Sequence, residues 1–250
     1  MNTLKLLLLA AQIMVISHRG EHLSHPENTI PAFQAAIDAN ADFFELDVRT
    51  TSDGQLVLMH DGTVDRTTDG HGAVYQMTFD QIRTLDAGAK FGPQFAGTKV
   101  PTFEEALRLA HGKIGVYVDC KMLAPEALVA MLEKTDMSDK VVIYGGAFFL
   151  KKVSELKPSL KVMPEADDAP TLAKLIDFLK LQVVAFDYHD FKDDVIAVAN
   201  QAKVPIYVDR LGPADNNDNW QDAIGRGAAG IQTDHPAELV NYLRAKGLHK

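Results

Sequence analysis

Short runs of β-branched and other apolar residues alternate along the chain with amphipathic segments of helical periodicity. This alternation is typical of a parallel α/β fold, in which each strand is followed by a helix that covers the sheet. No low-complexity linker or change of composition divides the sequence, so we expect one domain. The runs that predict strands are 13–17, 43–48, 56–60, 114–120, 141–144, 161–164, 183–187, 205–209 and 230–233.

The second and third predicted strands are joined by a connection too short for parallel neighbours. Only the turn around Ser52-Asp53-Gly54 separates them, whereas a parallel pair needs a crossover of about a dozen residues. We therefore expect an antiparallel hairpin, and centring it on the turn places Asp47 opposite His60. Without the return strand, eight parallel strands remain in a chain of 250 residues. That number and length predict an α/β fold, a TIM (β/α)8 barrel.

The ends of two helices and one long connection can be read from the sequence. Asn28-Thr29 can cap a first helix that has Pro31 in its first turn, and Thr102 with Glu105 has the spacing of a capping box. Residues 61–100 form a long excursion after the hairpin, and its last part, 90–100, is rich in glycine and predicts a loop. Connections of this length usually serve a function or cover a substrate. We therefore expect a barrel over 13–250, with 61–100 as an insertion over one end of it.

Composition excludes several classes of partner. The net charge of −9 argues against a nucleic-acid partner, and no apolar run approaches the roughly 20 residues of a membrane-spanning helix, so we expect no stable membrane insertion. A small anionic substrate remains possible, because a bound metal can reverse the local charge. Residues 1–12 fit either a short signal peptide or an N-terminal extension. We slightly favour export to a periplasmic or secreted location over a cytoplasmic one.

Polar side chains cluster at the ends of the predicted strands, which is where TIM barrels carry their reactive groups. Each residue alone would be weak evidence, but together they would converge on one barrel mouth, and apolar strands do not bury such groups without partners. These residues are His18 and Arg19 after the first strand, Glu45 and Asp47 on one face of the second, His60 after the hairpin, and Asp119 and Lys121 on one face of the next parallel strand.

The types of these residues indicate a chemistry. Glu45, Asp47 and Asp119 offer only oxygen ligands, which favours a hard divalent cation, Mg²⁺ or Ca²⁺. Arg19 and Lys121 are suited to binding phosphate oxygens. Histidines titrate near neutrality, so His18 and His60 are candidates for the general acid and the general base.

Several ordered motifs resemble the signature blocks of the glycerophosphodiester phosphodiesterase family. The resemblance is dense from about residue 15 to 110, returns at the C-terminus, and is looser between. The motifs are His18-Arg19-Gly20, Pro26-Glu27-Asn28-Thr29, Glu45-Leu46-Asp47-Val48, His60-Asp61, Asp65-Arg66-Thr67-Thr68-Asp69-Gly70, Leu85-Asp86-Ala87-Gly88, Phe91-Gly92, Phe95-Ala96-Gly97, Val100-Pro101-Thr102 and Gly230-Ile231-Gln232-Thr233-Asp234-His235-Pro236.

The resemblance implies a TIM barrel with a small insertion, metal ligation by Glu45 and Asp47, and acid–base roles for His18 and His60. It implies hydrolysis of a small glycerophosphodiester to sn-glycerol 3-phosphate and an alcohol through a cyclic phosphate. The family usually has glutamate where this chain has Asp119, although related spider-venom-type phospholipases look similar in using aspartate there. Other readings remain open: a phospholipase D-like cleavage of lysophospholipids, a phosphoinositide phospholipase C-like activity, or a non-catalytic barrel that binds phosphodiesters.

A second departure from the family lies on the seventh parallel strand, where a Trp-Thr-Val-Asn-like segment is replaced by Tyr207-Val208-Asp209-Arg210. With Glu165 and Asp187, Asp209 would make an unusually acidic mouth. Such a mouth could favour a cationic head group by charge and by cation–π contact, or the acids could be solvated loop residues. His22 and His25 mimic a helical metal site in spacing, but Gly20 and Pro26 flank them, so we expect loop residues near the mouth.

Overall fold

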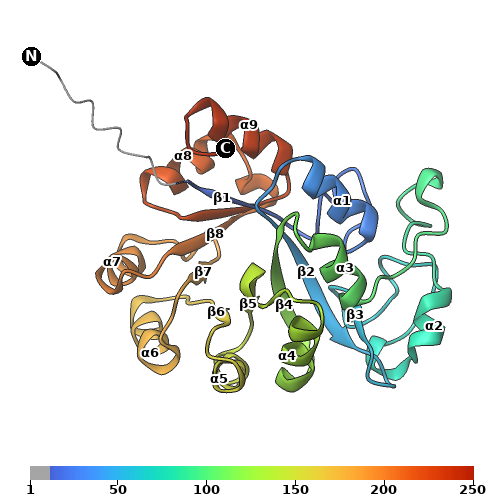
Figure 1. Cartoon of the computed structure of the whole chain (residues 1–250). Helices are drawn as coiled ribbons and strands as arrows, with labels where there is room; N and C mark the ends of the chain where they lie inside the picture. The colour runs from blue at the N-terminus through green and yellow to red at the C-terminus, as the bar shows by residue number, and fades with distance from the viewer. Residues whose placement is uncertain (1–11) are drawn as a thin grey trace, which may run out of the picture.

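Eight parallel strands and the helices between them form a nearly closed barrel, as the alternating pattern predicts (Figure 1). The computed structural model describes residues 12–250, so the predicted leader or extension lies almost wholly outside the described residues. The parallel strands are β1 (Met14–Ser17), β2 (Phe43–Thr50), β4 (Gly115–Met122), β5 (Val141–Tyr144), β6 (Lys161–Met163), β7 (Val184–Phe186), β8 (Ile206–Arg210) and β9 (Gly230–Thr233).

The strands follow one another in the order β6-β5-β4-β2-β1-β9-β8-β7. Continuous parallel ladders join each neighbouring pair in this order. Between β6 and β7 the barrel is closed by a single parallel bridge, Glu165 with Ala185, where the Ala185 N–H donates to the Pro164 carbonyl at 3.0 Å. The seam between β6 and β7 is therefore the weakest joint of the barrel.

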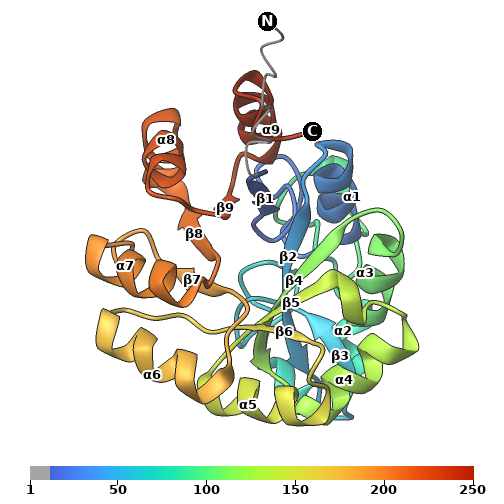
Figure 2. The ribbon, with the colours of Figure 1, turned by 60° about the vertical axis from the view of Figure 1, so that its left-hand side comes forward.

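The helices lie outside the strands and cover them, which Figure 2 shows from a second direction. No helix among the described residues has the length and apolar character needed to span a membrane. The helices are α1 (Ile30–Asp38), α2 (Phe79–Thr84), α3 (Phe103–Ala110), α4 (Pro125–Lys134), α5 (Ala147–Leu156), α6 (Ala169–Leu179), α7 (Asp193–Ala202), α8 (Asn217–Gly225) and α9 (Pro236–Ala245), with short 3-10 turns at Val74–Gln76, Pro93–Phe95, Ser138–Lys140 and Gly212–Ala214.

Alternation along each strand divides its side chains between two cores. One set, which includes Phe44, Leu46 and Val118, packs against the helices in the main hydrophobic core. The other set, which includes Ile16 and Tyr117, faces the barrel interior. Glu45 and Asp47 alternate with the first set and so point inward, where strand ends can gather polar groups. Cys120 packs against the outer core, as its position between Asp119 and Lys121 predicts.

The hairpin is confirmed, but its predicted register is wrong by one residue. β3 (Leu56–Leu58) pairs antiparallel with β2, with Val48 opposite Leu58. The Met59 N–H donates to the Asp47 carbonyl at 3.0 Å, so Met59 and not His60 lies opposite Asp47. The Thr51 N–H donates to the Gln55 carbonyl and closes a turn centred on Asp53, as expected. Counting outward from this centre pairs Asp47 with Met59, so the predicted partner was one residue too far along the chain.

One of the two predicted helix caps forms. Thr102 accepts a hydrogen bond from the Glu105 N–H, and the Glu105 side chain accepts from the Thr102 N–H, which completes the capping box of α3. Thr29 occupies the cap position of α1 but makes no side-chain cap, because its hydroxyl donates to the Pro26 carbonyl at 2.6 Å. Asn28 does not cap the helix either, since its side chain bonds to Asp47.

The insertion 61–100 packs beside the hairpin and carries a small hydrophobic core of its own, with β3 supplying part of it (Figure 1). That core contains Val57, Met59, Val64, Val74, Ile82, Ala87 and Val100. The segment 90–100, predicted as loop, contains the 3-10 turn Pro93–Phe95. Most of the apolar side chains of the insertion are at least partly buried, whereas Tyr75 and Phe91 are exposed. The insertion is therefore an ordered layer against the barrel.

Gly20 and Gly54 have nearly the same positive φ, +78° and +85°. Comparing alanine substitutions at the two positions therefore separates the cost of a steric clash from the cost of positive φ. A Cβ at Gly20 would lie 2.7 Å from the backbone carbon of Ala32, whereas one at Gly54 would meet nothing within 4 Å. We expect Gly54→Ala to destabilise by about 1–2 kcal/mol through positive φ alone. Gly20→Ala should cost about 1–3 kcal/mol more, because neighbouring backbone must shift. Urea unfolding followed by circular dichroism measures both, and equal costs would contradict the close approach.

Candidate active site

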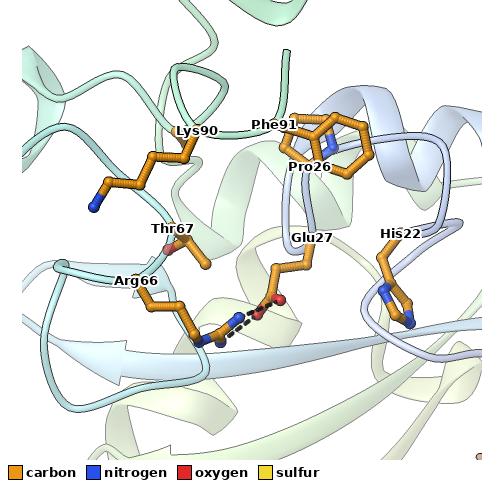
Figure 3. Close-up of a pocket in the computed structure, with 8 residues that line it drawn as sticks. His22, Pro26, Glu27, Arg66, Thr67, Lys90 and Phe91 are labelled. Atoms are coloured by element: carbon orange, nitrogen blue, oxygen red, sulfur yellow. Dashed lines mark hydrogen bonds and ion pairs between the residues drawn. The ribbon is translucent and has the colours of Figure 1, made fainter. Parts of the chain in front are cut away.

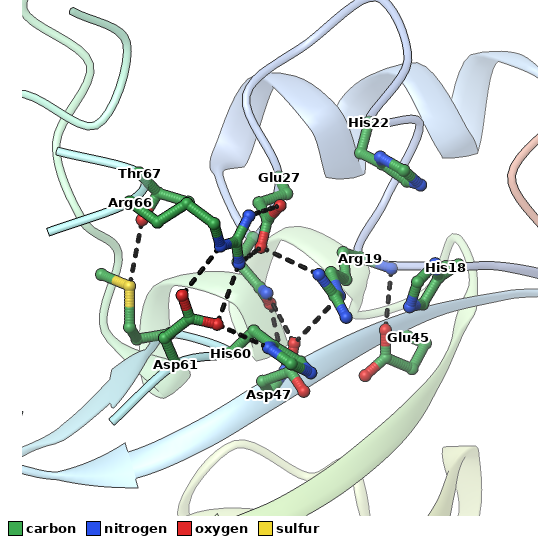
Figure 4. A network of polar contacts seen from close by, with 12 residues as sticks. His18, Arg19, His22, Glu27, Glu45, Asp47, His60, Asp61, Arg66 and Thr67 are labelled. Atoms are coloured by element: carbon green, nitrogen blue, oxygen red, sulfur yellow. Dashed lines mark hydrogen bonds and ion pairs between the residues drawn. The ribbon is translucent and has the colours of Figure 1, made fainter. Parts of the chain in front are cut away.

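Every site residue predicted from the sequence lines one cavity at the C-terminal ends of the strands. Figure 4 shows five of them, His18, Arg19, Glu45, Asp47 and His60. Strands β1, β2 and β4 and the end of the hairpin supply these residues. The far side of the cavity is formed by residues of β4, β5, β8 and β9 and the loop after β8. The lining residues are His18, Arg19, Glu45, Asp47, His60, Tyr117, Asp119, Lys121, Tyr144, Asp209, Leu211 and Gln232.

Glu45, Asp47 and Asp119 form a compact group of carboxylates. Asp47 on β2 lies opposite Asp119 on β4 in the ladder, and Glu45 lies two residues before Asp47 on the same face. One oxygen of each carboxylate lies within 4.8 Å of the others. Glu45 is 3% exposed and Asp47 is 1% exposed. Buried carboxylates at this separation fit a divalent cation that takes oxygen ligands.

The electrostatics of this group also favour a bound cation. Burial and the charges of Asp47 and Asp119 raise the pKa of Glu45 well above its ordinary value. Burial and the charge of Asp47 likewise raise the pKa of Asp119. Like charges held together out of water destabilise one another, and a divalent cation between them would reverse that effect.

The loop after β1 holds two of the carboxylates in place. The Arg19 N–H donates to Glu45 Oε2 at 2.7 Å. The Asn28 side chain donates to Asp47 Oδ2 at 2.7 Å and accepts from the Asp47 N–H at 3.0 Å. Arg19 and Asn28 both have positive φ, 52° and 56°, which turns the loop towards β2. This backbone geometry orients the acids independently of any ligand.

Two cations flank the carboxylates. Lys121 Nζ donates to Asp119 Oδ2 at 2.7 Å and lies 3.3 Å from Asp47 Oδ1. Although burial opposes it, these two charges raise the pKa of Lys121. Arg19 Nη1 donates to Glu27 at 3.2 Å, and Arg19 Nε lies 3.7 Å from Asp47 with no hydrogen-bond partner among the described residues. The Arg19 guanidinium thus retains a donor for a further oxygen.

His18 is oriented by Asp234, which follows β9. His18 Nδ1 and His22 Nε2 both lie 2.8 Å from Asp234 Oδ1. Although burial opposes ionisation, the hydrogen bonds from His18 and His22 hold the pKa of Asp234 well below its usual range. An ionised carboxylate only accepts hydrogen bonds, so each of these ring nitrogens carries a proton. Burial lowers the pKa of His18, with a further contribution from Arg19.

The group His18, His22 and Asp234 could also hold a metal by its spacing. The two hydrogen bonds to one carboxylate oxygen already account for that spacing. His22 is therefore a loop residue near the mouth, as expected, and its contact with Asp234 was not predicted.

His60 is oriented by a chain of ion pairs that ties the insertion to the barrel (Figures 3 and 4). His60 Nδ1 lies 2.8 Å from Asp61 Oδ1. Arg66 donates to Asp61 at 2.7 Å and, through both terminal nitrogens, to Glu27 at 2.7 and 2.8 Å. The Arg66 hydrogen bond holds the pKa of Asp61 well below its usual range. Glu27 belongs to the loop after β1, so this chain links both histidine-bearing segments.

Sequence reasoning missed the residues that orient the catalytic candidates. Asp234 directly follows the last strand, so the rule that reactive groups lie at strand ends could have found it. Asn28 was interpreted as a helix cap because asparagine is common there. The pair of Glu27 with Arg66 joins positions far apart in the chain, and no local pattern predicts it.

Comparison with known proteins places this geometry in a family. Residues 18–238 match the model of the glycerophosphoryl diester phosphodiesterase family. A glycerophosphodiester phosphodiesterase of Caldanaerobacter subterraneus is 35% identical over 246 residues, which covers 94% of this chain and 99% of the relative. One of Bacillus subtilis is 35% identical over 191 residues, covering 68% of this chain and 65% of the relative.

Solved structures show the same fold. The crystal structure of a glycerophosphodiester phosphodiesterase from Agrobacterium tumefaciens has a TM-score of 0.82 at 28% identity and covers 90% of this chain and 98% of its own. A phosphodiesterase from Oleispira antarctica, solved in complex with the product sn-glycerol-3-phosphate, has a TM-score of 0.85 at 21% identity and covers 93% of this chain and 97% of its own.

The carboxylate group predicts that divalent cations stabilise the protein. We expect Mg²⁺ or Ca²⁺ to raise the melting temperature of chelator-treated protein, because a ligand that binds only the folded state stabilises it by about 2.7 kcal/mol at about 100 times Kd. Asp119→Asn should remove most of this rise. Asp177→Asn, which neutralises an exposed acid on α6, is the matched control and should keep it. An equal rise in both variants would place the cation elsewhere.

Proposed function

Because the chain belongs to the glycerophosphodiester phosphodiesterase family, we propose that it hydrolyses small glycerophosphodiesters to sn-glycerol 3-phosphate and an alcohol. The observation that carries this proposal is that two carboxylate-paired histidines line the same cavity as the carboxylate group and two cations. Cleavage of a phosphodiester requires these groups together: positive charge beside the phosphate oxygens, one group that accepts a proton and one that donates a proton.

Glu45, Asp47 and Asp119 would hold a divalent cation, Mg²⁺ or Ca²⁺. When bound, the cation would supply positive charge at the non-bridging phosphate oxygens. Arg19 lines the same cavity and would add its positive charge there. Lys121 adds a second positive charge beside Asp119 and Asp47. Asp119 stands where the family usually has glutamate, and its position opposite Asp47 supports a ligand role for the shorter side chain.

His18 is suited to the role of general base in the first step. Its Nδ1 donates to Asp234, which leaves Nε2 of the neutral ring free to accept a proton. Burial lowers the pKa of His18, so the ring is neutral at neutral pH. His18 would remove the proton of the substrate hydroxyl next to the ester, the glycerol 2-OH, as its oxygen attacks phosphorus.

His60 is suited to the role of general acid. Its side chain is 34% exposed, against 16% for His18, so its charged form is better solvated. Asp61 accepts a hydrogen bond from Nδ1, which directs Nε2 away from the insertion. His60 would give its proton to the leaving alcohol as the bond from phosphorus to that oxygen breaks, and the product of this step is a cyclic phosphate.

The second step returns both histidines to their starting state. Water attacks phosphorus of the cyclic phosphate while His60 takes its proton, and His18 gives its proton to the departing 2-oxygen. The ring opens to sn-glycerol 3-phosphate. Each histidine serves once as acid and once as base, which requires both to be present for turnover.

We expect His18→Ala and His60→Ala each to lower kcat for glycerophosphocholine by about 100- to 10,000-fold. His111→Ala removes a histidine from the end of α3, half exposed and outside the cavity, and should retain normal turnover. A coupled assay for glycerol 3-phosphate measures all three. Retained turnover in either cavity variant would exclude the two-histidine mechanism.

The environment of His18 predicts the acid side of the pH profile. A base must be deprotonated, so kcat/KM should fall as pH falls through the pKa of His18, which lies below its ordinary value of about 6.5. Asp234→Asn removes a hydrogen bond and a charge that raise this pKa, so the acid limb should move to still lower pH. The variant should also lose about 100-fold or more in rate, because the ring is no longer held in one tautomer. An acid limb that moves to higher pH would argue against His18 as the base.

A further inference from the structure

The half of the cavity that faces away from the histidines is acidic and aromatic. Tyr117 on β4 and Tyr144 on β5 lie side by side, with ring centroids 5.8 Å apart. The Tyr144 hydroxyl donates to Glu165 at 2.5 Å, just after β6. Asp209 on β8 and Gln232 on β9 lie opposite each other in the ladder and complete this wall. None of these side chains has a part in the proposed proton transfers.

Asp209 is a strand residue of the cavity wall, so it is not a solvated loop acid. Its half-buried carboxylate forms no hydrogen bond or ion pair with the described residues. Burial, followed by the charges of Glu165, Asp187 and Asp119, raises the pKa of Asp209 to about 8. Asp209 is therefore largely protonated at neutral pH in the free protein, and a positively charged group beside it would favour its charged form.

Gln232 provides a second and independent sign of a ligand. It lines the same cavity, is 6% exposed, and its Oε1 has no hydrogen-bond partner among the described residues. Buried polar atoms usually have partners, and an unpaired one in a cavity wall indicates a group that is supplied from outside. An acceptor oxygen beside a carboxylate requires a donor, and a positively charged donor suits both.

We propose that this wall, formed by Asp209, Gln232, Tyr144 and Glu165, is the subsite for a leaving alcohol that carries an alkylammonium group. The inference rests on the proposed function and names its substrate class. A primary ammonium could donate to Asp209 and Gln232, and a quaternary ammonium could lie against the tyrosine rings. The phosphate would remain beside Asp119, whose ladder partner is Tyr144, and the head group would extend across the cavity towards Asp209 on β8 and Gln232 on β9.

Two other occupants are less consistent with these observations. A second metal ion would need several ligands together, yet among the described residues Asp209 belongs to no group of metal-ligating side chains with suitable spacing. The glycerol arm could donate hydroxyl groups to the wall, but it is neutral and would supply no counter-charge to the acids gathered there. The glycerol arm is the same in all of these substrates, whereas the leaving alcohol differs. Comparing substrates with different alcohols therefore shows which of the two groups lies against the wall.

The test compares kcat/KM for two cationic substrates, glycerophosphoethanolamine and glycerophosphocholine, with that for the neutral-alcohol substrates glycerophosphoglycerol and glycerophosphoinositol. The wild-type protein should prefer the cationic pair. Asp209→Asn should lower this preference by about tenfold or more, the effect of losing one charged hydrogen bond, and leave the neutral pair within about threefold. Asp177→Asn is the matched control and should keep the wild-type preference.

Several outcomes would overturn the proposal. Equal losses for all four substrates would place the shared glycerol arm against Asp209, and an unchanged preference would remove Asp209 from recognition. The ratio of the two cationic substrates shows whether a primary or a quaternary ammonium is preferred. Asp209→Asn should melt no lower than the wild-type protein, because it replaces an unpaired, half-buried carboxyl beside other acids with a neutral group of the same shape, so a loss of preference would not reflect misfolding.

A binding measurement separates failure of this inference from failure of the proposed function. Calorimetry with the His60→Ala protein should show tighter binding of glycerophosphoethanolamine than of glycerophosphoglycerol, and Asp209→Asn in that background should remove the difference. If the wild-type protein hydrolyses none of the four diesters but this difference is found, the proposed function is wrong and the subsite stands. If hydrolysis occurs and the two diesters bind equally, the subsite is wrong and the proposed function stands.

Discussion

Repulsion among three carboxylates, two of them buried and one half-buried, is the interaction around which the rest of the site is arranged. Glu45, Asp47 and Asp119 are brought together by two adjacent parallel strands, where the fold leaves little water to screen them. The surrounding contacts all act on this charge: a backbone N–H and an asparagine fix two of the acids, and Lys121 lies against the third. The three carboxylates repel one another, and a cation bound between them would relieve that repulsion.

Each of the two histidines is paired through Nδ1 with an aspartate, but the two pairs lie on different parts of the fold. His18 is oriented by Asp234 from the last strand, so this pair joins the two ends of the chain where β1 lies beside β9. His60 is oriented by Asp61 within the insertion, and the Arg66–Glu27 ion pair fixes the insertion to the loop after β1. His18 therefore follows a barrel strand, whereas His60 lies where the hairpin meets the insertion. Their relative position depends on the contact between barrel and insertion.

The fold was predictable because its main signals are local and periodic. Each predicted strand overlaps an observed one, and the hairpin followed from a connection too short for any other arrangement. The turn of the hairpin was placed correctly, but the predicted register was wrong by one residue, because pairing outward from Asp53 joins Asp47 to Met59 and not to His60. Asp234, Asn28 and Arg66 were missed for a different reason. Their roles arise from contacts between segments distant in sequence, which periodicity does not encode.

The single bridge between β6 and β7 has a consequence for how such a barrel can diversify. Glu165 forms that bridge, so one member of the acidic wall stands at the seam between β6 and β7. The carboxylate group lies on β2 and β4, which share the longest ladder and are separated from the seam by β5 and β6. Changes in chain length or residue type near the seam disturb few interstrand bonds. Changes near Glu165 would therefore alter the proposed head-group wall and leave the carboxylate group on β2 and β4 in place.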